Sequence, residues 1–201
     1  TADHFKGTKT CTSERTWGEC IKGTECEDGY TKCPDGTCQL ECPAATLDFI
    51  FQLEMRTHPR TDTMRIFARE KDSDAKFDEA LWNLETETGT AADGTGSASH
   101  LTLDDLDIGG SYDFLLKSTQ HLQKKKTIDS LKAENSLDFG TLQAGDLNGN
   151  QFIGGDDISI WVHEIEGEEK EKYQSDINAD GVLNGADVSI IIHNLKLRGD
   201  E

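Results

Sequence analysis

The feature that most constrains the fold is a duplication of thirty residues near the C-terminus. The segment Asp146-Leu-Asn-Gly-Asn150 returns thirty positions later as Asp176-Ile-Asn-Ala-Asp180. Five further residues keep their offsets, in the pairs Gly155 and Gly185, Asp157 and Asp187, Ser159 and Ser189, Ile160 and Ile190, and His163 and His193. Accident rarely preserves so many offsets, so the sequence predicts two copies of one structural unit.

Each copy carries oxygen-bearing side chains at the spacing of a calcium-binding loop. Such a loop provides ligands from positions 1, 3 and 5, a backbone carbonyl at position 7, often a water at position 9 and a carboxylate at position 12. In the first loop (146–157) these are Asp146, Asn148, Asn150, the carbonyl of Phe152 and Asp157. In the second loop (176–187) they are Asp176, Asn178, Asp180, the carbonyl of Val182, Asn184 and Asp187. The spacing predicts two Ca²⁺ ions, against the alternative of two acidic turns that bind no ion.

The first loop is predicted to be the weaker of the two. It offers Asp146 and Asp157 as carboxylate ligands, whereas the second loop offers three carboxylates. Gln151 also stands at the turn position that Gly181 fills in the second loop. Glutamine must adopt a left-handed backbone there at some cost, or shift the turn.

Apolar residues recur at helical spacing after each loop. They are Ile158, Trp161, Val162 and Ile165 after the first loop, and Val188, Ile191, Ile192 and Leu195 after the second. One loop-helix unit has too little apolar surface to fold alone, so we expect the two units to pack on each other, tied together by calcium. His163 and His193 lie just off these stripes. They are interpreted as ordinary helix histidines, because neither has a partner ligand beside it.

Residues 145 to 195 resemble a dockerin. The matching pieces are Gly145-Asp-Leu-Asn-Gly-Asn150, Gly155-Asp-Asp-Ile158, Asp176-Ile-Asn-Ala-Asp-Gly-Val-Leu-Asn184 and Ala186-Asp-Val188. The resemblance implies an α-helical, EF-hand-like loop-helix domain that docks onto a cohesin-like module in a calcium-dependent way. Cellulosomal dockerins often carry a Ser-Thr pair where this chain has Gly155-Asp156 and Gly185-Ala186, and this departure leaves the partner open.

All six cysteines lie in a segment before residue 43 that holds few large apolar residues. They are Cys11, Cys20, Cys26, Cys33, Cys38 and Cys42. We therefore expect residues 1–44 to form a disulfide-rich module, in which each bridge contributes roughly 2 to 4 kcal/mol. The sequence does not choose among the pairings. A zinc site is the rival interpretation, and it is disfavoured because there is no Cys-x-x-Cys pair and His4 is the only nearby histidine.

Residues 45 to 143 show the alternation of half-buried strands. Leu47, Phe49, Phe51, Leu53 and Met55 stand at every second position. Further short stretches of this kind follow up to residue 142, which predicts an all-β sandwich. The predicted fold class is thus multidomain: a disulfide-rich N-terminal module (1–44), a β-sandwich (45–143) and an α-helical dockerin-like domain (144–201).

The run Leu101-Thr-Leu-Asp-Asp-Leu-Asp-Ile-Gly-Gly-Ser-Tyr112-Asp-Phe114 resembles the closing hairpin of transthyretin-like, carboxypeptidase-regulatory-like sandwich domains. In those domains a glycine turn leads into a strand that begins with tyrosine. The resemblance implies a non-catalytic spacer or binding module.

Charge and hydropathy bear on the location and partners of the chain. It has 39 acidic and 20 basic residues, and a net charge of −19 works against binding to nucleic acid or to an anionic membrane. No apolar run approaches the length of a membrane span, and no apolar leader follows Thr1. We expect a processed, secreted protein that is extracellular or on the cell surface.

The residue patterns favour assembly over catalysis. The sequence contains no nucleophile elbow, no phosphate-cradling glycine loop and no histidine pair at zinc spacing, so we expect no enzyme. We expect a structural or assembly protein that contacts a cohesin-like module or further copies of itself, as in a surface fibre or filament. The alternative is an accessory subunit that binds glycan. It is disfavoured because residues 45–143 hold only Trp82 and Tyr112 as large stacking rings, and the strand pattern places Tyr112 in the core.

Overall fold

The structure is a computed structural model that describes residues 18–19, 31–32, 37–39, 44–167 and 174–201. The first three pieces are the strands β1 (Gly18–Glu19), β2 (Thr31–Lys32) and β3 (Thr37–Gln39), which pair antiparallel in the order β1-β3-β2. The disulfides and the rival zinc site predicted for residues 1–44 otherwise fall outside the described residues.

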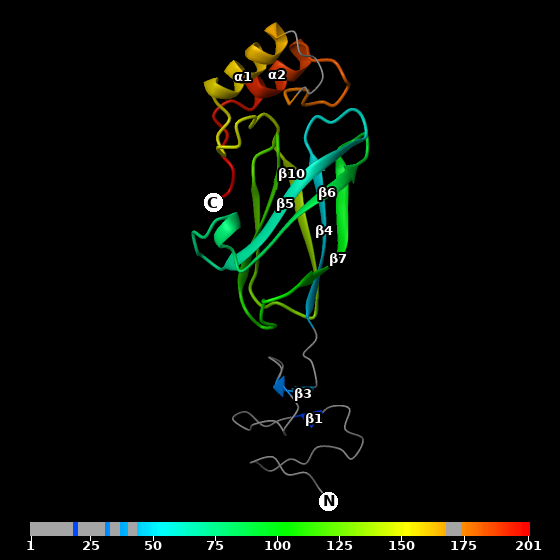
Figure 1. Cartoon of the computed structure of the whole chain (residues 1–201), viewed down its shortest axis with the longest axis vertical. Coiled ribbons are helices and arrows are strands. Elements are labelled where there is room, and N and C mark those ends of the chain that lie inside the picture. Colours follow the sequence, from blue (N-terminus) through cyan, green and yellow to red (C-terminus); the bar gives the residue numbers. More distant parts are fainter. Residues whose placement is uncertain (1–17, 20–30, 33–36, 40–43, 168–173) are drawn as a thin grey trace, which may run out of the picture.

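Seven longer strands form a β-sandwich (Figure 1). One sheet has the order β10-β4-β7, from β4 (Ala45–Leu53), β7 (Thr95–Leu103) and β10 (Glu134–Leu142). The other has the order β6-β5-β8-β9, from β5 (Arg60–Glu70), β6 (Trp82–Thr90), β8 (Tyr112–Ser118) and β9 (Lys124–Ile128). A short 3-10 helix, η1 (Phe77–Glu79), lies between β5 and β6. The predicted β-sandwich is therefore present.

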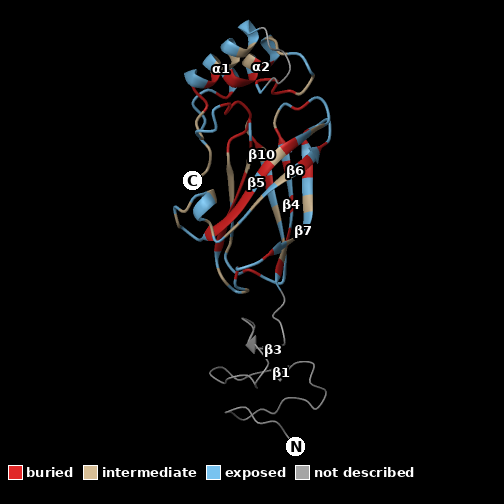
Figure 2. Cartoon of the chain, viewed as in Figure 1, coloured by how far each residue is buried: buried red, intermediate tan, exposed pale blue. Residues whose placement is uncertain are grey.

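Alternation along the strands explains the core between the sheets. In β4, every second side chain from Ala45 to Leu53 is buried, whereas the intervening Ile50 is 51% exposed. Met55 was predicted to continue this pattern, but β4 ends at Leu53 and Met55 is exposed with a left-handed backbone (φ 61°). Figure 2 shows the buried residues running along the inward faces of the strands.

One strand pairing was not anticipated from the sequence. β10 runs parallel to β4, with Leu137 opposite Phe49, and Phe139 meets the Phe49 ring edge-on at 5.9 Å between centroids. Parallel neighbours need a long crossover, here most of the sandwich. The pairing returns the chain to the end of β4, where the N–H of Ala144 donates to the Glu54 carboxylate at 3.0 Å.

The chain then forms two short helices at this end of the sandwich, α1 (Gly155–Glu166) and α2 (Gly185–His193) (Figure 1). Their apolar cluster contains Leu147, Ile153, Ile177, Ile190 and Ile191, and it includes Leu122 and Ala144 next to the sandwich. No described helix is long and apolar enough to cross a membrane.

The predicted apolar stripes of the helices are only partly correct. Ile191 is fully buried, and Ile158 and Trp161 pack against the cluster. Val162, Ile165, Ile192 and Leu195 were predicted to be buried but are 38%, 41%, 55% and 37% exposed. Ile190, outside the predicted stripe, is buried instead. The shift arises because each helix packs on its own loop and on the sandwich as well as on the other helix.

The predicted fold class is therefore wrong as a whole. The described chain is mainly β, and its two helices have only 12 and 9 residues. They share their apolar cluster with Leu122 of the sandwich, so they do not form the self-contained helical domain that was predicted for residues 144–201.

Candidate metal centre in the duplicated loops

Both loops are closed by the carboxylate at their last position. In the first loop, Asp157 Oδ1 accepts the N–H groups of Leu147 (2.8 Å) and Asn148 (3.2 Å), and Oδ2 accepts that of Gly154 (2.8 Å). In the second loop, Asp187 Oδ1 accepts from Ile177 (2.9 Å) and Asn178 (3.4 Å), and Oδ2 accepts from Asn184 (3.0 Å). Each Oδ2 accepts one bond and keeps a free lone pair. The predicted position-12 residues therefore lie beside the start of their loops.

The side chains at positions 3 and 5 are held by short-range hydrogen bonds. Asn148 and Asn150 accept the N–H groups of Asn150 and Phe152 at 2.9 and 2.8 Å. Asn178 and Asp180 accept those of Asp180 and Val182 at 2.9 and 2.8 Å. These bonds fix the side-chain oxygens along the loop before any ion is bound.

The first aspartate of each loop leaves one oxygen without a partner. Asp146 Oδ2 accepts the N–H of Gln151 at 3.2 Å, and Asp176 Oδ2 accepts that of Gly181 at 3.1 Å. The other oxygen, Oδ1, is buried in both aspartates and has no hydrogen-bond partner. A buried, unpaired carboxylate oxygen is costly unless a cation or donor satisfies it. The orphaned oxygens fit a hard cation such as calcium, whose ligands are oxygens.

The two loops differ in their burial. Asp146 and Asp157 are fully buried, but Asn148 and Asn150 are exposed and Phe152 is half-buried. In the second loop Asp176, Asn178 and Asp187 are buried, Asp180 and Asn184 are half-buried, and Val182 is exposed. Burial raises the pKa of the Asp187 carboxyl, and its three backbone N–H partners oppose this shift.

Gln151 adopts the left-handed backbone that its position requires, with φ 67° against 83° for Gly181. Its side chain takes part in a compensating contact, because Gln151 Oε1 accepts the N–H of Gln123 at 2.9 Å.

The C-terminal tail packs on the same loop. Ile153 and Leu197 are joined by an N–H···O bond of 3.1 Å, and the Arg198 guanidinium lies 4.5 Å from the centre of the Phe152 ring.

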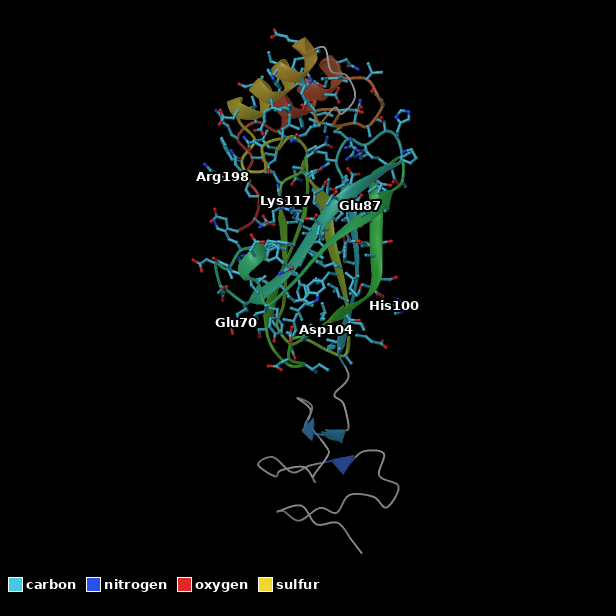
Figure 3. All side chains as sticks on the ribbon, in the orientation of Figure 1. Glu70, Glu87, His100, Asp104, Lys117 and Arg198 are labelled. Atoms are coloured by element: carbon cyan, nitrogen blue, oxygen red, sulfur yellow. The ribbon has the colours of Figure 1, made fainter. Side chains whose placement is uncertain are left out.

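Residues of the sandwich that the sequence did not single out support both loops. Lys117 Nζ donates to Asp146 Oδ2 at 2.6 Å. Arg60 donates to the Asp176 carbonyl at 3.2 Å, and Thr57 donates its N–H to the Asn178 carbonyl at 3.0 Å. Lys117 is labelled in Figure 3, at the end of the sandwich that faces the helices. No sequence pattern could have indicated these residues, because they are brought to the loops by strand pairing.

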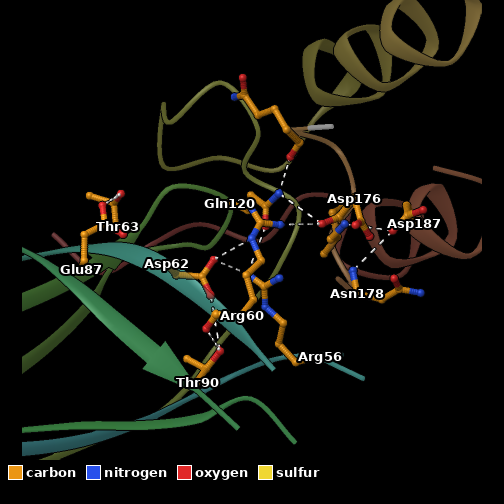
Figure 4. Close-up of polar contacts among 12 residues, drawn as sticks. Arg56, Arg60, Asp62, Thr63, Glu87, Thr90, Gln120, Asp176, Asn178 and Asp187 are labelled. Carbon is orange, nitrogen blue, oxygen red and sulfur yellow. Dashed lines mark hydrogen bonds and ion pairs between the residues drawn. The ribbon is translucent and has the colours of Figure 1, made fainter. Parts of the chain in front are cut away.

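A buried polar cluster lies beneath the second loop (Figure 4). Arg56 donates to Asp62 at 2.5 Å and to Gln120 at 3.3 Å, and the side chains of Arg56 and Asp62 are fully buried. Burial lowers the pKa of Arg56, while the neighbouring Asp62 raises it. Gln120 extends the cluster by donating to the backbone carbonyls of Gln174 and Asp176.

The histidines from His58 onwards, which the structure describes, do not contribute to the loops. His163 and His193 are exposed on the helices, as are His58 and His100 on the sandwich. His121 is fully buried with neither ring nitrogen hydrogen-bonded. Burial lowers its pKa to about 3, and the positive charge of Arg56 adds to the shift. Within residues 44–167 and 174–201, no three His, Cys, Asp or Glu side chains converge into a metal cluster, so calcium would also depend on amide and carbonyl oxygens.

Comparison with known proteins gives a fold likeness. No family model matches the chain, and no curated protein is similar enough to count as a match. Among solved structures, it is similar to an N-terminal interface mutant of a type II Cohesin-X-Dockerin complex from Acetivibrio cellulolyticus. The TM-score is 0.52 and the identity 15%, over 77% of this chain and 97% of the other. A C-terminal interface mutant of that complex gives a TM-score of 0.50 and 14% identity, with the same coverage.

These likenesses correct the family resemblance inferred from the sequence. The predicted dockerin-type module at residues 145–195, preceded by a transthyretin-like or carboxypeptidase-regulatory-like sandwich, is wrong. The comparisons support a mainly β sandwich as the fold, and the described residues contain only two short helices besides it. The duplication correctly indicated two similar loops, but a local repeat of this size does not determine the architecture of the whole chain.

Proposed function

We propose that this chain is a non-catalytic protein-docking module of an extracellular assembly, and that its two duplicated loops bind one calcium ion each. The observation that carries the calcium proposal is the pair of buried, unpartnered oxygens, Asp146 Oδ1 and Asp176 Oδ1, at the same position of both loops. In the first loop the ion would be held by Asp146, Asn148, Asn150, the Phe152 carbonyl and Asp157. In the second it would be held by Asp176, Asn178, Asp180, the Val182 carbonyl, Asn184 and Asp187.

Calcium would supply charge neutralisation and loop rigidity rather than chemistry. The hydrogen bonds within each loop already place most ligand oxygens, so the ion completes a preformed site. The loops in turn support the helices, because Ile153 of the first loop and Ile177 of the second belong to the same apolar cluster as Ile190 and Ile191. The ions would therefore stabilise the surface that the two helices present.

A docking role is supported by that surface. Val162, Ile165 and Ile192 are exposed on the helices, and Val182 in the second loop is 57% exposed. Exposed apolar side chains that gather on one end of a molecule are typical of protein contact sites. The solved structures with a similar fold are structures of a protein complex. The partner we propose is another extracellular protein, or further copies of this chain.

The described residues do not support the glycan-binding alternative. Tyr112 is 7% exposed, and its hydroxyl accepts the N–H of Asp107 at 2.9 Å, so its ring belongs to the core. Trp82 packs against the core and donates from its indole to the Thr102 carbonyl at 3.0 Å. Neither ring forms part of a flat row on which sugars could stack.

Calorimetric titration of the chain with calcium tests the metal proposal. We expect two ions for the wild type and one for each of Asp146→Asn and Asp176→Asn, because each variant removes the charge of one orphaned carboxylate. Asp104→Asn is the matched control, since this exposed aspartate lies at the opposite end of the sandwich (Figure 3). A wild type that binds no calcium, or variants that bind as it does, would contradict the proposal.

A further inference from the structure

The two loops differ in one contact that their sequences do not reveal. The Lys117 ammonium donates to Asp146 Oδ2 at 2.6 Å and to the His121 carbonyl at 3.0 Å. The Lys117 side chain is only 17% exposed and that of Asp146 is fully buried, so solvent screens the pair poorly. The contact joins strand β8 of the sandwich directly to the first ligand of the first loop.

The second loop has no matching contact within the described chain. Asp176 Oδ2 accepts only the N–H of Gly181. Arg60 donates to the Asp176 backbone carbonyl instead, and the buried Arg56 interacts with Asp176 through charge without a hydrogen bond to it. Among residues 44–167 and 174–201, no ion pair involves the carboxylate of Asp176, Asp180 or Asp187.

The pattern of free oxygens shows that Lys117 and an ion would occupy different positions on Asp146. Lys117 contacts Oδ2, whereas the orphaned oxygen is Oδ1. Calcium can therefore bind without displacing the ammonium. The two positive charges would then share one carboxylate in a poorly solvated place, and their repulsion opposes binding.

We propose that Lys117 sets the calcium affinity of the first loop: it weakens binding there and neutralises Asp146 when no ion is present. The inference rests on the proposed calcium function and adds the order in which the two loops bind calcium. The second loop fills first, and the first loop keeps its shape without an ion because Lys117 already partners its leading carboxylate. The charge of Lys117 thus lowers the calcium affinity of the first loop further, beyond the effect of its having two carboxylate ligands where the second loop has three.

The test is a calcium titration of the full chain followed by NMR, with the amide signals of Gly149 and Gly181 reporting the first and second loop. Lys117→Met removes the charge, and we expect it to tighten the first site by about tenfold while the second site is unchanged. Lys117→Gln provides a second neutral variant that retains a hydrogen-bond donor, and we expect the same tightening. Lys117→Arg keeps the charge and should bind as the wild type does.

Lys71→Met is the matched control. Lys71 forms an exposed ion pair with Asp129 and directly follows β5, at the end away from Arg60. The variant removes the same charge as Lys117→Met and should leave both calcium sites unchanged. Thermal unfolding in chelator supplies a separate readout: both neutral variants should unfold at a lower temperature than the wild type, because Asp146 loses its partner. If the wild type binds two ions and the neutral variants bind calcium at the first loop no more tightly than it does, the proposed role of Lys117 is wrong. That result would leave the proposed calcium function untouched. A wild type that binds no calcium would overturn the proposed function as well.

Discussion

Asp146 and Asp176 stand thirty residues apart, yet each accepts a backbone N–H at Oδ2 from the residue five positions later and leaves Oδ1 buried without a partner. The same deficiency therefore occurs twice in one molecule. Strain in one loop would have no reason to repeat at the same atom of the other, whereas a carboxylate oxygen placed to bind a cation would recur in both copies. This relationship underlies the calcium proposal.

Asp187→Ala should lower the calcium affinity of the second loop more than Asn150→Ala lowers that of the first. Asp187→Ala eliminates a charge and the acceptor of three backbone N–H groups, whereas Asn150→Ala eliminates a neutral ligand and one such bond. Calorimetry on both variants measures the two losses. Equal losses would show that ligand charge does not govern affinity here.

Stability should fall in mildly acidic solution because of His121. Its pKa is about 3 in the folded protein against the ordinary value of 6.5, so only the unfolded chain takes up a proton between these values. Neutral His121 contributes fully to the free energy of unfolding above pH 6.5. This contribution is lost as the pH falls towards 3, by up to about 1.4 kcal/mol for each pH unit.

Urea unfolding between pH 7.5 and 5 measures this slope. His121→Gln should flatten it, and the same change at the exposed His58 should not. A slope that persists in His121→Gln would assign the acid sensitivity to other groups.

The buried Arg56–Asp62 pair should matter far more than an exposed one. Arg56→Ala leaves Asp62 buried and without its strongest partner, which should cost about 3 to 5 kcal/mol of unfolding free energy. Arg65→Ala breaks a pair whose side chains are 57% and 48% exposed, and should cost less than about 1 kcal/mol. Denaturant unfolding compares the two variants, and similar losses would contradict the assigned burial.

Self-association should depend on calcium if the helical end is a contact surface between copies. Light scattering of the wild type should give a larger mass in calcium than in chelator. Ile192→Glu should abolish this increase, because it places a charge on the exposed apolar surface, and Ile50→Glu on the sandwich should not. A strict monomer in both conditions would leave a separate protein as the partner.

The sequence indicated the loops well because their order is local. Spacings such as that from Asp146 to Asp157 are set within a few residues, so a repeat reveals them directly. The alternation from Leu47 to Leu53 likewise indicated a strand with one buried face. The disulfide-rich module expected at residues 1–44 stays a prediction, because the segment lies largely outside the described residues.

Long-range contacts account for what the sequence missed. The parallel pairing of β10 with β4 joins residues far apart in the chain, and no periodicity predicts it. Lys117 and Arg60 reach the loops only because β8 ends and β5 begins beside them. Ile192 was assigned to a buried stripe because helical spacing alone does not say which side of a helix the sandwich covers. The dockerin assignment of residues 145–195 was wrong for a similar reason, since a local repeat does not show how its two units pack on the rest of the chain.

A crystal structure of the chain grown in calcium would test the central claim most directly. We predict two ions, one within about 2.3–2.6 Å of Asp146 Oδ1 and one at the same distance from Asp176 Oδ1. Anomalous scattering would identify them as calcium. Loops that are well ordered at saturating calcium, with no ion beside either oxygen, would contradict the account.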